Sequence, residues 1–377
     1  MGRDVGRAKA AIIGVGGSSI ERRSDRSIVA FALDAAMAAL ADAGIDREQI
    51  DGYIGSPKAS HAAALHVDGA DEISARLLAG RLGLENLSVA IDLNSAFPTE
   101  MVTTAGHLLH SGACDYLLAV RALCNLPGVR YGEVKSREAH GEEQFTAPFG
   151  YHTGGARFAT RLQAYFSASG ATRRDLYELV ALMRRNASRN PHAIWRDKSE
   201  IALDDYLRSP LIAEPLCMLD CDMPVSGAVA FVMTRPELAA ASRQPPVYVA
   251  GSANWLTADE IFERSGRDRT DIDLCQIYDG FSFLVYEWLE RLGWCPPHAA
   301  WRYVRDGECE IGGELPVNTF GGALGEGRLH GAGHVREAVL QLRGQAGDRQ
   351  VPGAADCLVQ VGPFDYSSLL VLSNDPA

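Results

Sequence analysis

The sequence predicts an α/β protein made of two similar halves, with an inserted cap region in the first half. Short apolar strands alternate with amphipathic helices over about the first 121 residues, as expected for a sheet covered by helices on both faces. This rhythm then breaks into glycine- and aromatic-rich loops, and it restarts at Val247 after a connection that contains Pro236, Pro245 and Pro246. We therefore expect an N-terminal half at 1–236 that includes the cap at about 122–225, and a C-terminal half at 237–377.

The elements of the N-terminal half follow from apolar periodicity and glycine stops. Residues 10–16 form an apolar run, but Gly14-Val15-Gly16-Gly17 lacks the third glycine of a dinucleotide-binding loop, so we expect a structural turn after a buried strand. Apolar residues recur on one helical face between Ser27 and Ala43, and Gly44 supplies a stop. The same criteria predict further strands at 50–55, 88–92, 115–121 and 228–234, and helices at 99–111, 154–169 and 173–189.

The C-terminal half repeats this alternation in the order of its elements, although residue identity does not show a repeat. His330 and His334 have a spacing that suits metal ligands only on a helix. Glycine is a poor helix former, so the three glycines around them argue against a helix there, and we expect no metal pair. The predicted elements of this half are strands at 247–251, 273–278, 358–361 and 368–372, and a helix at 283–292.

The composition limits the functional classes. The chain has 377 residues and a formal net charge of −12, whereas nucleic-acid binding needs a concentrated basic surface, so we expect no nucleic-acid partner. No apolar run reaches the ~18 residues of a membrane-spanning helix, and we expect no membrane association. The eight cysteines are scattered and no signal peptide is visible, which favours reduced thiols, no zinc site and a cytoplasmic location.

Three motifs in the C-terminal half carry a resemblance to a known family. They are Tyr278-Asp279-Gly280-Phe281, Asn318-Thr319-Phe320-Gly321-Gly322 and Gly327-Arg328. This layout resembles the thiolase superfamily in its sterol-carrier-protein-like branch, and most of all the lipid-transfer-protein-like steroid aldolases. The resemblance implies a five-layered αβαβα core, a homodimer and a small OB-fold partner of the DUF35 type. Further markers in the same order are Asp42-Ala43-Gly44-Ile45, Gly106-His107, Arg121 with Asn125, Gly128 and Arg130, and Asn186-Ala187 with Asn190-Pro191.

The chain lacks two residues on which thiolase chemistry depends. By resemblance, Ala96 stands where a thiolase has its nucleophilic cysteine, and Arg328 stands where it has an activating histidine. Alanine cannot form an acyl-enzyme, and arginine cannot act as a general base at neutral pH. The steroid aldolases resemble this chain but have a tyrosine at the position of Arg328. Ser95 and Thr99 flank Ala96, and we interpret both as helix caps.

The resemblance places Tyr278 and Asp279 at the end of a strand, where sterol-carrier thiolases have a His-Asp pair. A phenol, with a reference pKa of ~10, transfers protons more readily when a nearby cation favours its ionised form. We expect Tyr278 to accept a proton, Asp279 to orient it, and Arg328 with Asn318 to stabilise a developing oxyanion. The alternatives are that Asp279 caps the helix that follows it, and that Arg328 binds a CoA phosphate or pairs with Glu326 on the surface. The residues expected to contact the substrate are Gly321, Gly322, Gly327, His330 and Tyr366.

The expected function is that of an aldolase, a carbon–carbon lyase that cleaves a β-hydroxyacyl-CoA to a ketone or aldehyde and a shorter acyl-CoA. A steroid side chain is one candidate for the acyl group. The reaction requires no covalent intermediate, which agrees with Ala96, and no cofactor is expected because CoA is part of the substrate. Two alternatives remain open: a non-catalytic thiolase-like subunit that binds acyl-CoA or acts as a scaffold, and an acyltransferase with an unassigned nucleophile.

Overall fold

Two sets of strands with the same internal order meet at β1 (Ala11–Gly17) and β8 (Val247–Asn254) to form one mixed sheet. The computed structural model describes residues 10–55, 73–93, 97–125, 139, 141–151, 153–198, 200–363 and 366–376. Within these ranges the strand order is β3-β2-β4-β7-β1-β8-β11-β10-β9. The other strands of this sheet are β2 (Gly52–Gly55), β3 (Val89–Asp92), β4 (Tyr116–Leu123), β7 (Gly227–Thr234), β9 (Leu274–Ile277), β10 (Asp356–Val361) and β11 (Ser368–Ser373).

The strand pairing repeats between the two halves. In the N-terminal set, β2 runs parallel to β3 and β4, and β7 is antiparallel to β4 and β1. In the C-terminal set, β9 runs parallel to β10, and β11 is antiparallel to β10 and β8. A parallel bridge between Cys275 and Val317 lies beside β9, at the place that β3 takes beside β2 in the other half. The pseudo-repeat predicted from element order is therefore confirmed by the strand topology.

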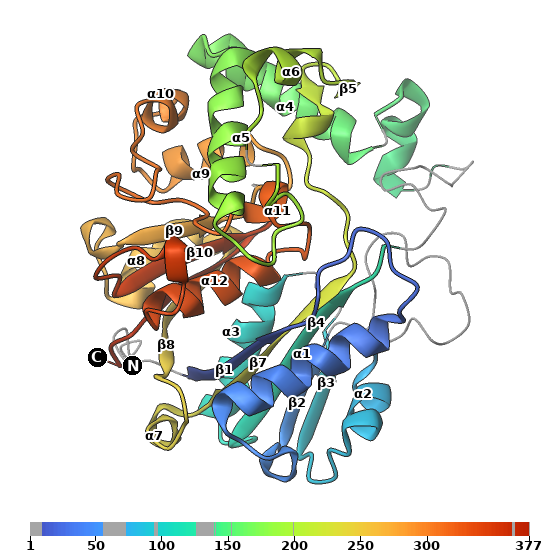
Figure 1. Cartoon of the computed structure of the whole chain (residues 1–377), viewed down its shortest axis with the longest axis vertical. Coiled ribbons are helices and arrows are strands. Elements are labelled where there is room, and N and C mark those ends of the chain that lie inside the picture. The colour runs from blue at the N-terminus through green and yellow to red at the C-terminus, as the bar shows by residue number, and fades with distance from the viewer. Residues whose placement is uncertain are drawn as a thin grey trace.

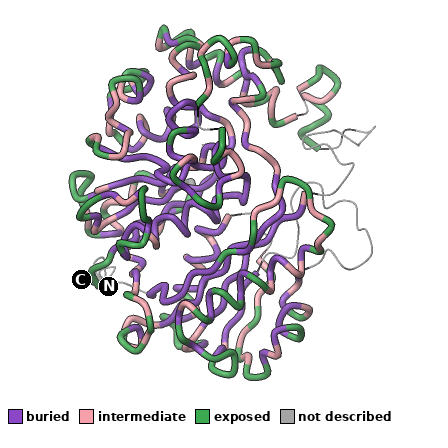
Figure 2. Tube along the Cα trace, in the orientation of Figure 1, coloured by how far each residue is buried: buried purple, intermediate pink, exposed green. Residues whose placement is uncertain are grey.

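Helices fill the space between the two strand sets and cover their outer faces. α3 (Pro98–His110) and α12 (Ala332–Leu342) share one apolar core with strands of both halves. α1 (Ile28–Ala43) and α2 (Ala75–Leu82) pack on the other face of the N-terminal strands, and α9 (Leu284–Arg291) covers the C-terminal strands. This is the five-layered αβαβα arrangement that the resemblance implies (Figure 1), and its layers hold most of the buried chain (Figure 2).

The cap lies at one end of the molecule, above the C-terminal half in Figure 1. It contains α4 (Gly154–Ser169), α5 (Arg173–Ser188), α6 (Leu203–Arg208) and a hairpin of β5 (Leu211–Ala213) with β6 (Leu216–Cys217). None of the described helices combines the length and the apolar character that crossing a membrane requires. The remaining short α-helices are α7 (Pro236–Ala239), α8 (Ile261–Ser265), α10 (Ala300–Arg305) and α11 (Gly322–Gly325).

The structure corrects the expectation of a non-helical segment around His334. α12 has 11 residues, begins directly after Gly331 and carries Gly333 in its first turn. Its apolar residues lie in the central layer, where they contact strands of both halves. Tertiary burial therefore outweighs the low intrinsic helix propensity of glycine.

The start of α3 also differs from the prediction. Pro98 occupies the first helical position, and the N-cap residue Phe97 makes no side-chain capping hydrogen bond. Thr99 lies inside the first turn and is buried, so its interpretation as a helix cap is wrong. Ser95 and Ala96 lie outside the described residues.

Candidate active site

Tyr278 follows β9 directly, at the carboxyl end of a parallel strand pair. Its backbone N–H donates to the carbonyl oxygen of Gln360 at 3.0 Å and lies 3.3 Å from the side-chain oxygen of the same residue. Gln360 is buried and donates its own side-chain amide to the carbonyl of Gly362. Ligand sites in α/β folds form at the carboxyl ends of strands, and Tyr278 is half-buried at such a position.

A carboxylate from the cap connection lies next to this phenol. The Tyr278 hydroxyl donates to Oδ2 of Asp222 at 3.1 Å. The backbone N–H of Asp222 donates to the carbonyl of Gly280 at 3.1 Å, and the adjacent Cys221 forms a β-bridge with Phe281. These backbone contacts hold Asp222, which is only 6% exposed, against the segment that follows β9.

Arg328 approaches the same carboxylate from a second segment. Its backbone N–H donates to the carbonyl of Met223 at 2.9 Å, and its Nε lies 3.8 Å from Oδ1 of Asp222. Its Nη1 contacts Nε2 of His330, whose Nδ1 lies 2.9 Å from Nη2 of Arg121 on β4. A continuous chain of polar contacts therefore joins both halves of the molecule. We call Asp222, Tyr278, Arg328, His330 and Arg121 the Tyr278 cluster.

Burial sets the ionisation of this cluster. Burial raises the pKa of Asp222 to about 7, while the charge of Arg328 and the hydrogen bond from Tyr278 lower it and the charge of Asp279 raises it. Burial also lowers the pKa of Arg121 to about 10, and the positive charge of Arg328 acts in the same direction. Asp222 can therefore exchange a proton near neutral pH, whereas both arginines remain cations.

His330 lies between two guanidinium groups in a left-handed backbone conformation, with a φ of 49°. A neutral imidazole has one donor and one acceptor nitrogen, whereas both guanidinium groups are donors. Only one of the two contacts is therefore a full hydrogen bond in either tautomer. His330 thus lies between the two arginines and separates and positions them.

The carboxylate of Asp279 contacts other groups than the Tyr278 phenol that it was predicted to orient. Its carboxylate accepts hydrogen bonds from the backbone N–H groups of Ala323 at 2.7 Å and Leu324 at 3.1 Å, in the first turns of α11. Nε2 of His334 lies 3.2 Å from its Oδ1. Asp279 thus holds the start of α11, and not the start of the helix that follows it in the chain, which was the alternative interpretation. The structure gives the orientation of the Tyr278 phenol to Asp222 instead.

The side chain of Asn318 also has another role. Its Oδ1 accepts from the N–H of Ile277 at 2.8 Å, and its Nδ2 donates to the carbonyl of Ile277 at 2.7 Å. The residue is fully buried and has a φ of 49°. Both amide groups therefore hold the end of β9, and Asn318 positions Tyr278 through the backbone. The predicted contact of Asn318 with a developing oxyanion has no support in this geometry.

The three glycines predicted to contact the substrate lie at close approaches between segments. Gly322 has a φ of 63°, and a Cβ atom added to it would lie 2.1 Å from Oδ2 of Asp279. Gly327 has a φ of 125°, and its added Cβ would lie 2.7 Å from the side chain of Val225. A Cβ atom added to Gly321 would lie 2.7 Å from Cβ of Ala187 in α5. The two amides that follow Gly322 donate to Asp279. The close approaches give the three glycines a packing role, and their contact with the substrate stays a prediction.

Tyr366 is 56% exposed, and its ring stacks on Phe97 with the centroids 5.8 Å apart. It lies before β11, and its contact with the substrate stays a prediction.

The structure thus brings Tyr278, Arg328 and His330 together, but it directs Asp279 and Asn318 to the backbone.

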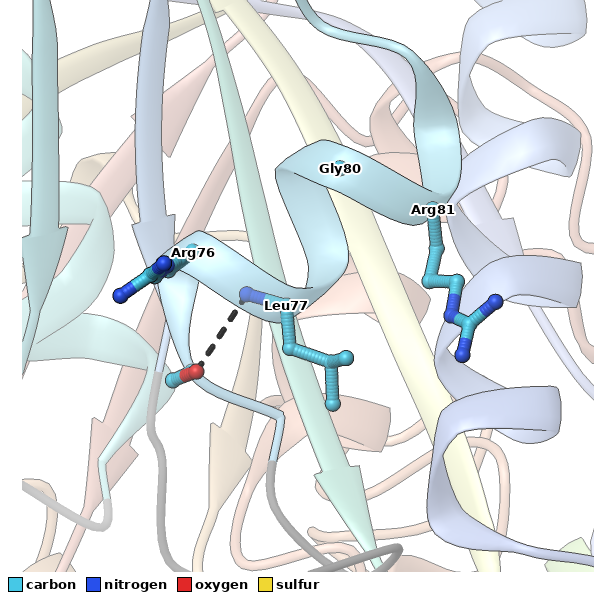
Figure 3. A pocket seen from close by; sticks show the side chains of 5 residues that line it. Arg76, Leu77, Gly80 and Arg81 are labelled. Atoms are coloured by element: carbon cyan, nitrogen blue, oxygen red, sulfur yellow. Dashed lines mark hydrogen bonds between the residues drawn. The ribbon is translucent and has the colours of Figure 1, made fainter.

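Two hollows on the described surface contain no member of the Tyr278 cluster. One lies on α2, where Ser74 caps the helix by accepting from the N–H of Leu77 (Figure 3). The other lies between α4 and α9, where Arg161 forms an ion pair with Glu287 at 2.6 Å. Both are lined mostly by residues of the outer helices, and neither lining includes a residue of the cluster.

The eight cysteines give no activated nucleophile. Seven are buried and Cys221 is partly exposed. Burial raises the pKa of Cys221 and Cys357, and it raises the pKa of Cys114 and Cys295 to about 12. A nucleophilic thiolate requires a lowered pKa, so acyl transfer through cysteine has no support here. The interpretation of Cys357 as a core residue is confirmed.

Asp222 and Arg121 received no role from the sequence. Arg121 offers a signal, because it is a charged residue within the otherwise apolar strand β4. Asp222 offers none, because its contact with Tyr278 joins residues that are 56 positions apart and arises only on folding.

Comparisons with known proteins identify relatives of this chain. Residues 242–374 match the family described as thiolase C-terminal domain-like. The chain is 31% identical to a 17-hydroxy-3-oxo-4-pregnene-20-carboxyl-CoA lyase of Mycobacterium tuberculosis, over 97% of this chain and 99% of that protein. It is 30% identical to a steroid side-chain-cleaving aldolase of Thermomonospora curvata, over 97% and 98% of the two proteins.

The solved structures give the same result. The structure of an Ltp2-ChsH2(DUF35) aldolase matches with a TM-score of 0.86 at 28% identity, and the match covers 98% of both chains. An acetyl-CoA acetyltransferase from Syntrophomonas wolfei shares the fold alone, with a TM-score of 0.69 at 15% identity over 99% of this chain and 100% of that one. On its sequence identity to full-length relatives, the chain belongs to the thiolase-like carbon–carbon lyases that include the steroid side-chain-cleaving aldolases.

Proposed function

We propose that this protein cleaves the bond between Cα and Cβ of a β-hydroxyacyl-CoA, giving a ketone or aldehyde and a shorter acyl-CoA. The observation that carries the proposal is the hydrogen bond between the Tyr278 phenol and Asp222 beside Arg328, in a member of a lyase family. A retro-aldol cleavage needs a group that removes the hydroxyl proton and a cation that stabilises an enolate. The Tyr278 cluster supplies both.

Tyr278 takes the proton of the β-hydroxyl group in this reaction. The oxygen then forms a carbonyl, the Cα–Cβ bond breaks, and its electron pair moves into the enolate of the thioester. Arg328 is the side chain of the cluster that stabilises the enolate oxygen, because a guanidinium remains charged throughout. No covalent acyl-enzyme forms, which is consistent with the raised pKa values of the buried thiols.

The names of the relatives support a substrate class and an assembly. One is named as a 17-hydroxy-3-oxo-4-pregnene-20-carboxyl-CoA lyase and another as a steroid side-chain-cleaving aldolase. The proposed substrate here is a CoA thioester with a steroid side chain or a similar branched acyl group. The similar structure is named as an aldolase with a DUF35 protein, which supports a DUF35 partner for this chain. We also propose a homodimer and no cofactor besides the CoA of the substrate. Light scattering of the chain with and without a co-expressed DUF35 protein tests the assembly.

The reaction is tested with a series of 3-hydroxyacyl-CoA esters, by mass spectrometry of the carbonyl product and the shorter acyl-CoA. We expect wild type, assayed with its partner, to release both products in equal amounts. Tyr278→Phe should lower the rate about 10²- to 10⁴-fold, the usual contribution of an acid–base group. Cleavage by Tyr278→Phe at the wild-type rate would refute this mechanism. Saturable binding of the esters without turnover would instead identify a non-catalytic subunit, and a trapped acyl-enzyme would identify an acyltransferase.

A further inference from the structure

The position of Asp222 is fixed by two segments of the C-terminal half at once. On one side, its N–H donates to Gly280, and Cys221 bridges to Phe281. On the other side, Pro224 bridges to Arg328, and the N–H of Arg328 donates to Met223. The connection between β6 and β7 therefore runs between the segment that carries Tyr278 and the segment that carries Arg328.

The direction of the hydrogen bond matters for the chemistry. A neutral phenol holds one proton and cannot keep a second, so Tyr278 accepts the substrate proton only if it passes its own proton on. The Tyr278 hydroxyl already points at Oδ2 of Asp222, 3.1 Å away. We propose that Asp222 is the final acceptor of the β-hydroxyl proton and receives it through Tyr278. This role rests on the proposed aldolase function and adds a catalytic residue to it.

The step balances without any further reactant. The substrate O–H proton moves to the Tyr278 oxygen while the Tyr278 proton moves to Oδ2 of Asp222. The electron pair of the substrate O–H bond becomes part of the new carbonyl, and the Cα–Cβ pair becomes the thioester enolate. Return of the proton from Asp222 through Tyr278 to Cα releases the shorter acyl-CoA and restores the carboxylate.

The neighbouring buried acids have other fixed partners. Asp279 accepts from two backbone amides of α11 and contacts His334. Asp220 accepts from the hydroxyls of Tyr206 at 2.7 Å and Ser282 at 2.9 Å, and from a backbone N–H. Asp222 is thus the carboxylate that the structure directs at the phenol.

Three groups act on the ionisation of Asp222 besides its burial. Arg328 and the Tyr278 phenol favour the carboxylate, and Asp279 favours the neutral acid. The resulting pKa of about 7 lets Asp222 take up and return a proton under neutral conditions. A simple counter-ion for Arg328 would instead be expected to remain ionised throughout the working range.

The test compares Asp222→Asn and Asp222→Glu with wild type, as the full chain with its partner. We expect Asp222→Asn to lower kcat about 10²- to 10⁴-fold with little change in the Kd of a 3-deoxyacyl-CoA, which cannot react. In wild type, kcat should rise with pH as Asp222 ionises near 7, and Asp222→Asn should lose this limb. Asp222→Glu, which keeps a carboxylate, should retain the limb and part of the rate. Asp42→Asn is the matched control, because Asp42 also pairs with an arginine, Arg343, at 2.7 Å but has no place in the cluster.

The outcomes separate this role from the proposed function. A wild type that cleaves 3-hydroxyacyl-CoA, with Asp222→Asn equally fast, would overturn the role of Asp222 and leave the aldolase function standing. An Asp222→Asn enzyme that loses only affinity and keeps the acid limb would also overturn it, because Asp222 would then merely position Arg328. A wild type that cleaves no 3-hydroxyacyl-CoA would overturn the proposed function and this role together.

Discussion

Nη2 of Arg121 lies 2.9 Å from Nδ1 of His330, although 209 residues separate the two in the chain. Arg121 belongs to β4 of the N-terminal half, whereas His330 precedes α12 of the C-terminal half. The other ring nitrogen of His330 contacts Arg328. A residue that is far from Tyr278 in the sequence therefore helps to set the position of Arg328, the cation beside that phenol.

We expect His330→Asn to fold normally, because asparagine tolerates the left-handed φ of 49°. It cannot span both arginines, so Arg328 should lose a positioning contact worth about 1–2 kcal/mol. The expected result is a fall in kcat of about 5- to 30-fold for cleavage of 3-hydroxyacyl-CoA. The control is His298→Asn, since His298 has a φ of 65° but is exposed and outside the cluster. Equal losses in the two variants would contradict the positioning role.

Asp222 should make stability depend on pH. Burial raises its folded-state pKa from 3.8 to about 7, so between these values the folded protein binds one proton more than the unfolded chain. The stabilisation from this group is therefore fully present below about pH 4 and is lost as pH rises through about 7. The free energy of unfolding of Asp222→Asn minus that of wild type should therefore increase by about 2–3 kcal/mol from pH 5 to pH 8, because only wild type loses this stabilisation. Urea unfolding at the two pH values measures this change, and a constant difference would argue against a raised pKa.

Asp279 should be a structural residue with a large effect on folding. Asp279→Ala leaves two backbone amides of α11 without their acceptor and removes the partner of His334. Hydrogen bonds to a charged group contribute about 1.5–3 kcal/mol each, so we expect a loss of roughly 3–5 kcal/mol in the free energy of unfolding. Chemical denaturation measures it. Full stability with lost activity would instead support the original prediction that Asp279 orients Tyr278.

Two glycines should respond to alanine in opposite directions. Gly322→Ala requires a Cβ atom 2.1 Å from Oδ2 of Asp279 at a φ of 63°, and we expect a loss of at least about 3 kcal/mol of stability. Gly80→Ala places a Cβ in open space inside α2 (Figure 3), and the higher helix propensity of alanine should add about 0.5–1 kcal/mol. Thermal unfolding of both variants checks the pair. A neutral Gly322→Ala would show that this loop rearranges.

Periodicity and glycine stops predicted the order of most strands and the helices 27–43, 154–169 and 173–189, because burial of one face leaves a regular trace in the sequence. α12 was missed because its glycines lower local propensity, while its stability comes from packing between the two sheets. Thr99 was misassigned because Pro98 starts the helix without a side-chain cap.

The candidate site was only partly predictable. Tyr278 and Arg328 lie in motifs whose order resembles a known family, and the structure places them around one carboxylate. The sequence does not show which carboxylate this is, because Asp279 is adjacent to Tyr278 and is therefore the obvious candidate. Asp222 reaches the phenol only through its long-range backbone hydrogen bond to Gly280. Proximity in the sequence predicts which residues contact each other within a turn. It does not predict the contacts of the connection between β6 and β7, which lies between the segments of Tyr278 and Arg328.

The matched family domain, residues 242–374, holds Tyr278, Arg328 and His330 but leaves Asp222 and Arg121 upstream of its first residue. A protein made of this domain alone would have Tyr278 but would lack Asp222, which we propose as the final acceptor of its proton. Chimeras that swap halves between relatives at the connection near 237 should therefore work only when the donor of the first half brings a compatible aspartate and arginine. Recombination at that point would exchange acid–base partners along with the scaffold.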